Sequence, residues 1–364
     1  MDPRIASHAE LLVDHCSDVQ QGDLVVVNAP PEAADLETAL YERLGERGAM
    51  PVGISMPSRG MRAFAAAIDT DDLVPADHAL ALVEEADVLI GIRASANVSE
   101  MSGLDPASLQ AFSKIQEPLM AESMATETVG TQYPAPGNAQ KAEMSTDDYE
   151  EFVWNAVNKD WDEQREFQEQ MVDLLADGDQ VHIVAGDRTD VRMRTADNPV
   201  KNDYGEDNLP GGEVFTAPVP DSVEGTVYFD KPVMAQGREL DGVYLEFEDG
   251  DVVDYDADEH AELIGAVLDT DDGARRVGEL GIGMNRDIDR FTYNMLFDEK
   301  MGDTVHLALG RAYPETVADG VEQNESAVHK DMIVDMSEDS YIEIDGEVVQ
   351  RNGTFKFEDG FEAT

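Results

Sequence analysis

The predicted secondary structure alternates between strands and helices in the first half of the chain and consists mainly of consecutive strands in the second half. This change limits the folds that the sequence can adopt. In the first half, short apolar segments at 23–29, 50–56 and 86–94 alternate with amphipathic segments. Nearly continuous apolar strands separated by helices are typical of a parallel sheet with helices on both faces. We therefore expect residues 1–178 to form an α/β domain with a doubly wound parallel sheet.

The second half predicts short strands that follow one another directly. They are expected at 180–186, 189–195, 226–230, 243–256, 304–310 and 341–350, with one helix at about 258–269. Asp249-Gly250 and Asp345-Gly346 are dipeptides that favour tight β-hairpin turns. Residues 179–364 are therefore expected to form a mixed α+β domain rich in antiparallel strands.

Two further segments of the first half are less regular. Asp105-Pro106 favours the start of a single helix that continues to about residue 125, and the Pro/Gly-rich stretch 128–140 predicts irregular structure. The first strand is followed by VNAPPEAAD, which lacks the glycine pattern of nucleotide-binding turns. We expect this domain to serve as a scaffold, a dimer surface or a substrate gate.

The acidic excess of the chain limits its partners and its environment. The sequence has 79 Asp and Glu against 25 Lys and Arg, and its net charge of −54 is spread over every segment. Hydrophobic periodicity and 42% hydrophobic residues argue against disorder. At molar ionic strength the Debye length falls to about 3 Å, which screens repulsion between surface carboxylates. We therefore expect a cytoplasmic protein of an extreme halophile; the alternative is an acidic surface for a basic partner.

Other classes of protein are disfavoured by features that the sequence lacks. It has no cluster of Lys and Arg to neutralise nucleic-acid phosphates, and no apolar run of membrane-spanning length. The start MDPRIASHAE has no signal-peptide pattern, and the single Cys16 allows no internal disulfide. The prediction is a protein without nucleic-acid or membrane partners.

Histidine and carboxylate side chains recur on predicted strands between residues 278 and 331. Strand side chains alternate between two faces, so Glu279 shares a face with two glycines, and His306 shares a face with Thr304 and Ala308. His329 and Asp331 point the same way in the segment HKD. Imidazole with carboxylate suits zinc, cobalt or manganese, and shared carboxylates suit two ions. The alternative is the polar, solvated face of half-buried strands.

The other five histidines give weaker evidence for a metal site. His8, His15, His78 and His260 fall in helical or loop segments without a partner at ligand spacing, and His182 has no nearby carboxylate on the same strand face. We expect these five to be structural or solvent-facing.

Four sequence blocks together resemble the aminopeptidase T/S family, the thermophilic-type metallo-aminopeptidases. They are NLPGGEVFTAP at 208–218, GELGIGMN at 278–285, FDEKMGDTVHLALGRAY at 297–313 and ESAVHKDMI at 325–333. Weaker similarity covers nearly the whole chain. The resemblance implies a homodimer with an enclosed site, which admits short or unfolded peptides.

The resemblance also implies a two-metal site and assigns its residues. The implied metal ligands are Glu213, Glu279, His306, His329 and Asp331, with Tyr313 beside them. Two features depart from the family pattern. Lys330 stands where an aromatic residue is usual, and the loop 314–324 lacks a glycine pair. Neither departure removes a ligand.

These residues predict a metal-dependent aminopeptidase in which two divalent ions, zinc, cobalt or manganese, activate a water. Tyr313, which the resemblance assigns to the site, can donate a hydrogen bond to the oxyanion. Glu279 is either a ligand or the general base, and Glu299 can support a ligand. The chain has neither HExxH nor GxSxG. The alternatives are another two-metal hydrolase, an amidase or a phosphoesterase with Arg311 as the nearby basic residue, or a binding module with a structural metal.

Overall fold

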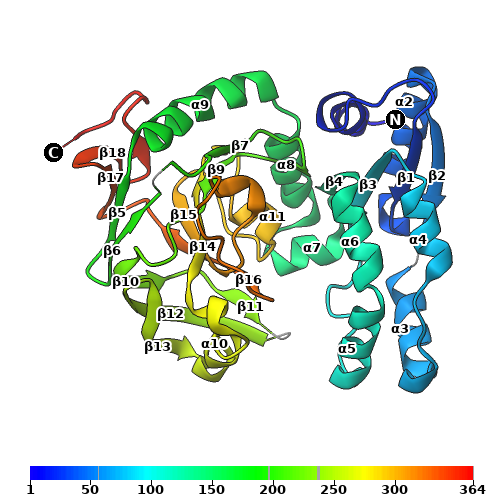
Figure 1. Ribbon diagram of the computed structural model, residues 1–364. Coiled ribbons are helices and arrows are strands. Elements are labelled where there is room, and N and C mark those ends of the chain that lie inside the picture. Colours follow the sequence, from blue (N-terminus) through cyan, green and yellow to red (C-terminus); the bar gives the residue numbers. More distant parts are fainter. Residues whose placement is uncertain (56, 196, 236–237, 364) are drawn as a thin grey trace. The chain divides into compact units, whose positions relative to one another are not determined.

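The computed structural model describes residues 1–55, 57–195, 197–235 and 238–363 (Figure 1). The chain divides into two compact units. Unit 1 comprises residues 1–159 and 205–211, and unit 2 comprises residues 160–204 and 212–364. The sequence divided the chain at residue 178, whereas the structure places helix α9 (Trp161–Asp177) in unit 2. The difference arises because α9 packs on strands of unit 2: Gln168 donates to the backbone oxygens of Asp203 and Glu213.

Unit 1 is built on a parallel sheet of five strands. Their order is β2-β1-β3-β4-β8, and every pair is parallel. The chain thus adds strands first on one side of β1 and then on the other, which is the doubly wound arrangement that the alternation predicted. The strands are β1 (Leu24–Asn28), β2 (Met50–Ile54), β3 (Val88–Arg93), β4 (Glu127–Gln132) and β8 (Asn208–Leu209). The predicted strand 50–56 ends at Ile54, and Met56 lies outside the described residues.

Two predictions for unit 1 were wrong in detail. The single helix expected from residue 105 to 125 is instead two helices, which are separated at Gln116. Pro118 lies in the first turn of the second helix, where a proline is tolerated. The stretch 128–140 contains β4 and a short helix instead of irregular structure. The helices are α1 (Pro3–Glu10), α2 (Ala34–Arg47), α3 (Ser58–Ala67), α4 (Asp77–Glu84), α5 (Pro106–Ile115), α6 (Glu117–Ala125), α7 (Pro136–Lys141) and α8 (Thr146–Val157). A π-helical segment, Leu11–Cys16, continues α1.

Unit 2 is dominated by antiparallel strands, as expected. The larger sheet has the order β11-β12-β10-β6-β5-β17-β18-β19, with β13 on β12. Its strands are β5 (Gln180–Ala185), β6 (Thr189–Arg194), β10 (Glu224–Phe229), β11 (Val233–Ala235), β12 (Arg238–Glu248), β13 (Asp251–Glu259), β17 (Ser340–Ile344), β18 (Glu347–Arg351) and β19 (Thr354–Phe355). Asp249-Gly250 and Asp345-Gly346 form the predicted hairpin turns, with all four residues at positive φ.

The second sheet of unit 2, which we call the site sheet, has the order β16-β15-β14-β9-β7. Its strands are β7 (Lys201–Asp203), β9 (Glu213–Thr216), β14 (Val277–Gly283), β15 (Thr304–Gly310) and β16 (His329–Asp335). Helices α10 (Ala261–Leu268) and α11 (Met295–Asp298) complete the unit. Within the described chain, no helix is both long and apolar enough to cross a membrane.

One face of the site sheet belongs to the hydrophobic core of unit 2. Alternate residues of its strands are fully buried there and pack with side chains from the larger sheet and α9; they include Val214, Leu280, Ile282, Val305, Leu307, Leu309, Met332 and Val334. Burial of this apolar face fixes which side of each strand faces the core. The residues between them are thereby directed to the opposite face.

Candidate metal centre

The opposite face of the site sheet carries all five predicted ligands. Glu213 lies on β9, Glu279 on β14, His306 on β15, and both His329 and Asp331 on β16. These four strands are neighbours in the sheet. The predicted ligands therefore come together from segments that lie up to about 120 residues apart in the chain.

Small residues stand directly opposite the functional side chains. Gly283 pairs with Glu213, Gly281 pairs with His306, and Ala308 pairs with both Glu279 and Asp331. A Cβ atom on Gly281 would lie 2.0 Å from Cε1 and Nε2 of His306. The imidazole therefore lies over the Gly281 backbone, and only glycine leaves space for it.

Two groups of three residues in this cluster have the composition and spacing of a cation site. The inner group is Glu213, Glu279 and His306, all buried; the outer group is Glu279, His329 and Asp331, of which the last two are partly exposed. In each group, one potential ligand atom per residue lies within 4.8 Å of the others. Glu279 belongs to both groups and is placed between them.

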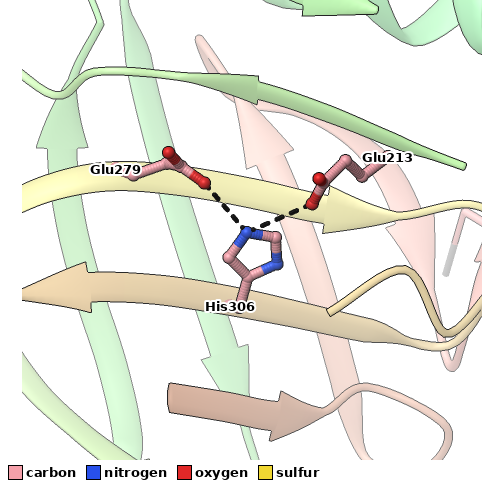
Figure 2. Close-up of side chains that lie close together, drawn as sticks. All are labelled: Glu213, Glu279 and His306. Carbon is pink, nitrogen blue, oxygen red and sulfur yellow. Dashed lines mark hydrogen bonds and ion pairs between the residues drawn. The ribbon is translucent and has the colours of Figure 1, made fainter. Parts of the chain in front are cut away.

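In the inner group, Nε2 of His306 points between the two carboxylates (Figure 2). It lies 3.1 Å from Oε1 of Glu279 and 3.4 Å from Oε2 of Glu213. In the outer group, Nε2 of His329 lies 3.3 Å from Oδ1 of Asp331 and 3.9 Å from Oε2 of Glu279. The two imidazoles thus face the same shared carboxylate.

Buried carboxylate oxygens that accept no hydrogen bond show that these residues fit a metal ion. Oε2 of Glu213 and Oε2 of Glu279 are buried and accept no hydrogen bond from the described residues. A buried carboxylate oxygen without a partner is costly, and a divalent cation satisfies it. Nitrogen and oxygen ligands of this kind suit zinc, cobalt and manganese.

Electrostatics within the cluster favour charged imidazoles when no cation is present. Burial lowers the pKa of His306, but its hydrogen bond to Glu279 and the charges of nearby carboxylates outweigh burial and raise this pKa to about 10. For His329 burial is likewise outweighed, chiefly by Asp331, and the pKa rises to about 9. Burial raises the pKa of Glu213 to about 8 despite the nearby Lys300. The raised pKa values of the two imidazoles show that Glu279 and Asp331 favour positive charge beside them, whereas burial favours the protonated form of Glu213.

Lys300 is a site residue that the sequence reasoning missed. Its side chain is fully buried, and its Nζ lies 2.9 Å from Oε1 of Glu213, 2.5 Å from Oε1 of Glu299 and 3.5 Å from Oδ2 of Asp203. Burial opposes its charge, but the three carboxylates raise its pKa well above the ordinary value. The available signal was its position beside Glu299 in the block DEK.

The basic residues considered from the sequence lie elsewhere. Arg311 is exposed at the end of β15, and Nζ of Lys330 donates to the backbone oxygen of Met234. Lys330 thus points away from His329 and Asp331, as strand alternation predicted. The cation nearest the inner group is therefore Lys300.

Tyr313 and Glu299 lie close to the two groups. The Tyr313 ring centroid is 4.8 Å from that of His329 and 6.4 Å from that of Phe215. Burial, together with the charges of Glu279 and Asp331, raises the pKa of the Tyr313 hydroxyl, so it keeps its proton. Glu299 reaches the cluster through Lys300, which supports the idea that it acts indirectly.

The remaining histidines form no such group among the described residues. One expectation was nevertheless wrong: Nε2 of His182 lies 2.8 Å from Oδ1 of Asp190 on the neighbouring strand. Asp190 is diagonal to His182 across the β5–β6 pair, a relation that the position of the strands alone does not reveal.

Comparisons with known proteins agree with this fold. Aminopeptidase 2 from Geobacillus stearothermophilus is 28% identical over 418 residues, covering 98% of both chains. Aminopeptidase AmpS from Bacillus subtilis (strain 168) is 25% identical over 411 residues, covering 97% of this chain and 98% of the relative. The solved structure of wild-type AmpT from Thermus thermophilus superposes with a TM-score of 0.86 at 25% identity, covering 97% of this chain and 99% of that chain.

The fold and the cluster, taken with these relatives, define a hydrolase of the metallo-aminopeptidase class that depends on a divalent metal. The thermophilic metalloprotease (M29) family matches residues 1–357, and the chain belongs to that family.

Proposed function

We propose that this metalloprotease removes N-terminal residues from short peptides by means of two divalent cations, zinc, cobalt or manganese. The observation that carries the proposal is the pair of three-residue groups that share Glu279. Two cations held by a common carboxylate are a recurring arrangement in hydrolytic enzymes, aminopeptidases among them.

Each side chain has a defined place in this proposal. Glu213, Glu279 and His306 hold one cation, and Glu279, His329 and Asp331 hold the other. When bound, such ions supply Lewis acidity, which acidifies a water and polarises the carbonyl of the scissile bond. Since Glu279 contacts both imidazoles, we assign it as the shared ligand in preference to a separate general base.

Tyr313 stabilises the oxyanion that develops on the scissile carbonyl. Its hydroxyl keeps its proton because burial and nearby carboxylates raise its pKa. Its ring lies against His329, at the more exposed side of the cluster, where a substrate enters. A donor placed at a developing oxyanion contributes about 10²- to 10³-fold to kcat.

The net charge of the chain and its family resemblance support proposals for the environment, the oligomeric state and the domain roles of the enzyme. We propose that it works in the salt-rich cytoplasm of a halophile, which the net charge of −54 supports. We also propose a homodimer, supported by the family resemblance. The N-terminal part of the chain, predicted from the sequence as residues 1–178, serves as its scaffold, and the C-terminal part, predicted as residues 179–364, is catalytic. Helix α9 belongs with the catalytic part, which carries the cluster.

The test is hydrolysis of amino-acid p-nitroanilides in molar KCl, before and after chelation and with zinc, cobalt and manganese added back. We expect activity to disappear on chelation, to return with metal and to be absent in Glu279→Gln. Activity that survives exhaustive chelation contradicts the proposal. Hydrolysis of p-nitrophenyl phosphate without hydrolysis of anilides indicates a phosphoesterase instead.

A further inference from the structure

The inner and outer groups differ in the hydrogen bonds and ion pairs that surrounding residues make to their side chains. We propose that the outer group (Glu279, His329 and Asp331) binds its cation first and more tightly, and that Lys300 makes the inner group (Glu213, Glu279 and His306) the weaker site. This inference rests on the proposed two-cation function. It adds an order of filling and a residue that sets it.

The first difference lies in the two imidazoles. Nδ1 of His329 donates to the backbone oxygen of Arg311 at 2.8 Å, which fixes the ring and leaves Nε2 free to bind a cation. Nδ1 of His306 is buried and has no hydrogen-bond partner among the described residues. Hydrogen bonds to the second ring nitrogen contribute about 10- to 100-fold to metal affinity. Only the outer group has this support.

The second difference lies in the carboxylates. Nζ of Lys300 already occupies Oε1 of Glu213, so only Oε2 of that carboxylate remains for a cation. The ammonium also places a positive charge beside the inner group, which repels a second cation at short range in a buried environment. In the described part of the chain, no Lys or Arg forms an ion pair with Glu279 or Asp331. The outer group meets no such competitor.

The residues around Lys300 determine whether its removal strengthens or weakens cation binding at the inner group. Asp203 and Glu299 contact the same ammonium as Glu213, and Asp203 stands directly opposite Glu213 across the β7–β9 pair. Loss of the ammonium therefore leaves three carboxylates close together. Such a cluster attracts a divalent cation, and Glu213 can then offer both oxygens. Removing Lys300 should strengthen binding at the inner group.

The experiment is a Co²⁺ titration of the metal-free full-length protein in molar KCl, followed by calorimetry and by the visible absorption of bound cobalt. We expect two steps, with dissociation constants that differ by at least about tenfold. His306→Ala should remove the weaker step, and His329→Ala the tighter one. Lys300→Met should tighten the weaker step by about tenfold or more, whereas Lys356→Met, which removes a surface lysine paired with Glu347, should change neither.

Several results overturn the inference: two equal steps, loss of the tighter step in His306→Ala, or an unchanged weaker step in folded Lys300→Met. If Lys300→Met does not fold, the wild-type steps and the two histidine variants decide the order of filling. A single equivalent of cobalt contradicts the proposed function itself. Two unequal steps without peptide hydrolysis contradict the proposed reaction and support the inference.

Discussion

Gly281 lies directly opposite His306 in the pair β14–β15, and a Cβ atom at this position would come within 2.0 Å of the imidazole. The backbone of one strand thus forms the surface against which the His306 imidazole of the next strand rests. Because of this close approach, the position of the His306 ring depends on the position of the β14 backbone.

Gly281→Ala should therefore displace the His306 ring and weaken both folding and metal binding. We expect a loss of about 1–3 kcal/mol in the free energy of unfolding, as for other substitutions that overfill a packed site. Gly45→Ala is the matched control, because a Cβ there meets nothing within 4 Å in helix α2, and alanine favours the helix. Denaturant unfolding and cobalt titration of both variants measure the two effects. Equal stability and equal cobalt binding in the two variants would show that His306 has room to move.

Tyr313→Phe tests the oxyanion role without removing the ring that packs on His329. We expect kcat on amino-acid anilides to fall by about 10²- to 10³-fold, with KM changing much less. Tyr341→Phe, on β17 of the larger sheet, is the control and should leave both constants unchanged. Steady-state kinetics at saturating metal separate the two parameters. A change confined to KM would assign Tyr313 to substrate binding.

His8 gives unit 1 a predicted sensitivity to acid. It is fully buried, its Nε2 lies 2.7 Å from Oγ1 of Thr131, and burial lowers its pKa to about 3 from an ordinary value near 6.5. The folded state therefore binds fewer protons than the unfolded state between these values. The stability that depends on neutral His8 is complete above pH 6.5 and is lost as the pH falls towards 3. The loss amounts to about 2 kcal/mol by pH 5.

His8→Gln should remove this part of the acid sensitivity. Between pH 7.5 and pH 5, we expect the loss in free energy of unfolding to be smaller in the variant than in the wild type by about 2 kcal/mol. His78→Gln, at an exposed position of α4, is the control and should follow the wild type. Denaturant titrations at the two pH values provide the comparison. Parallel pH dependences in all three proteins would exclude His8 as the source.

The net charge of −54 should make folding depend on salt. Screening shortens the range of repulsion between surface carboxylates, so we expect the melting temperature to rise steeply from dilute buffer to molar KCl. Thermal unfolding followed by circular dichroism measures it, and sorbitol at equal osmolality separates screening from exclusion of cosolute. A melting temperature that does not change with KCl would rule out adaptation to high salt.

The sequence was least informative about β4. Its residues Glu127–Gln132 include a glycine and three threonine or glutamine residues, and they resemble a loop when they are read alone. Parallel pairing with β3 and β8 supplies the hydrogen bonds that make this segment a strand. Tertiary pairing overrides local preference in strands more readily than in helices.

The sequence by itself determined the class of fold and the strand faces on which Glu279, His306, His329 and Asp331 lie, because strand alternation is a local property of the backbone. It placed His329 and Asp331 together for the same reason. Only the tertiary structure decided that β9 lies beside β14, which brings Glu213 to His306, and that Lys300 reaches Glu213 from a turn 87 residues further along the chain. These contacts depend on the long-range burial of apolar strand faces in one core, which no local pattern specifies.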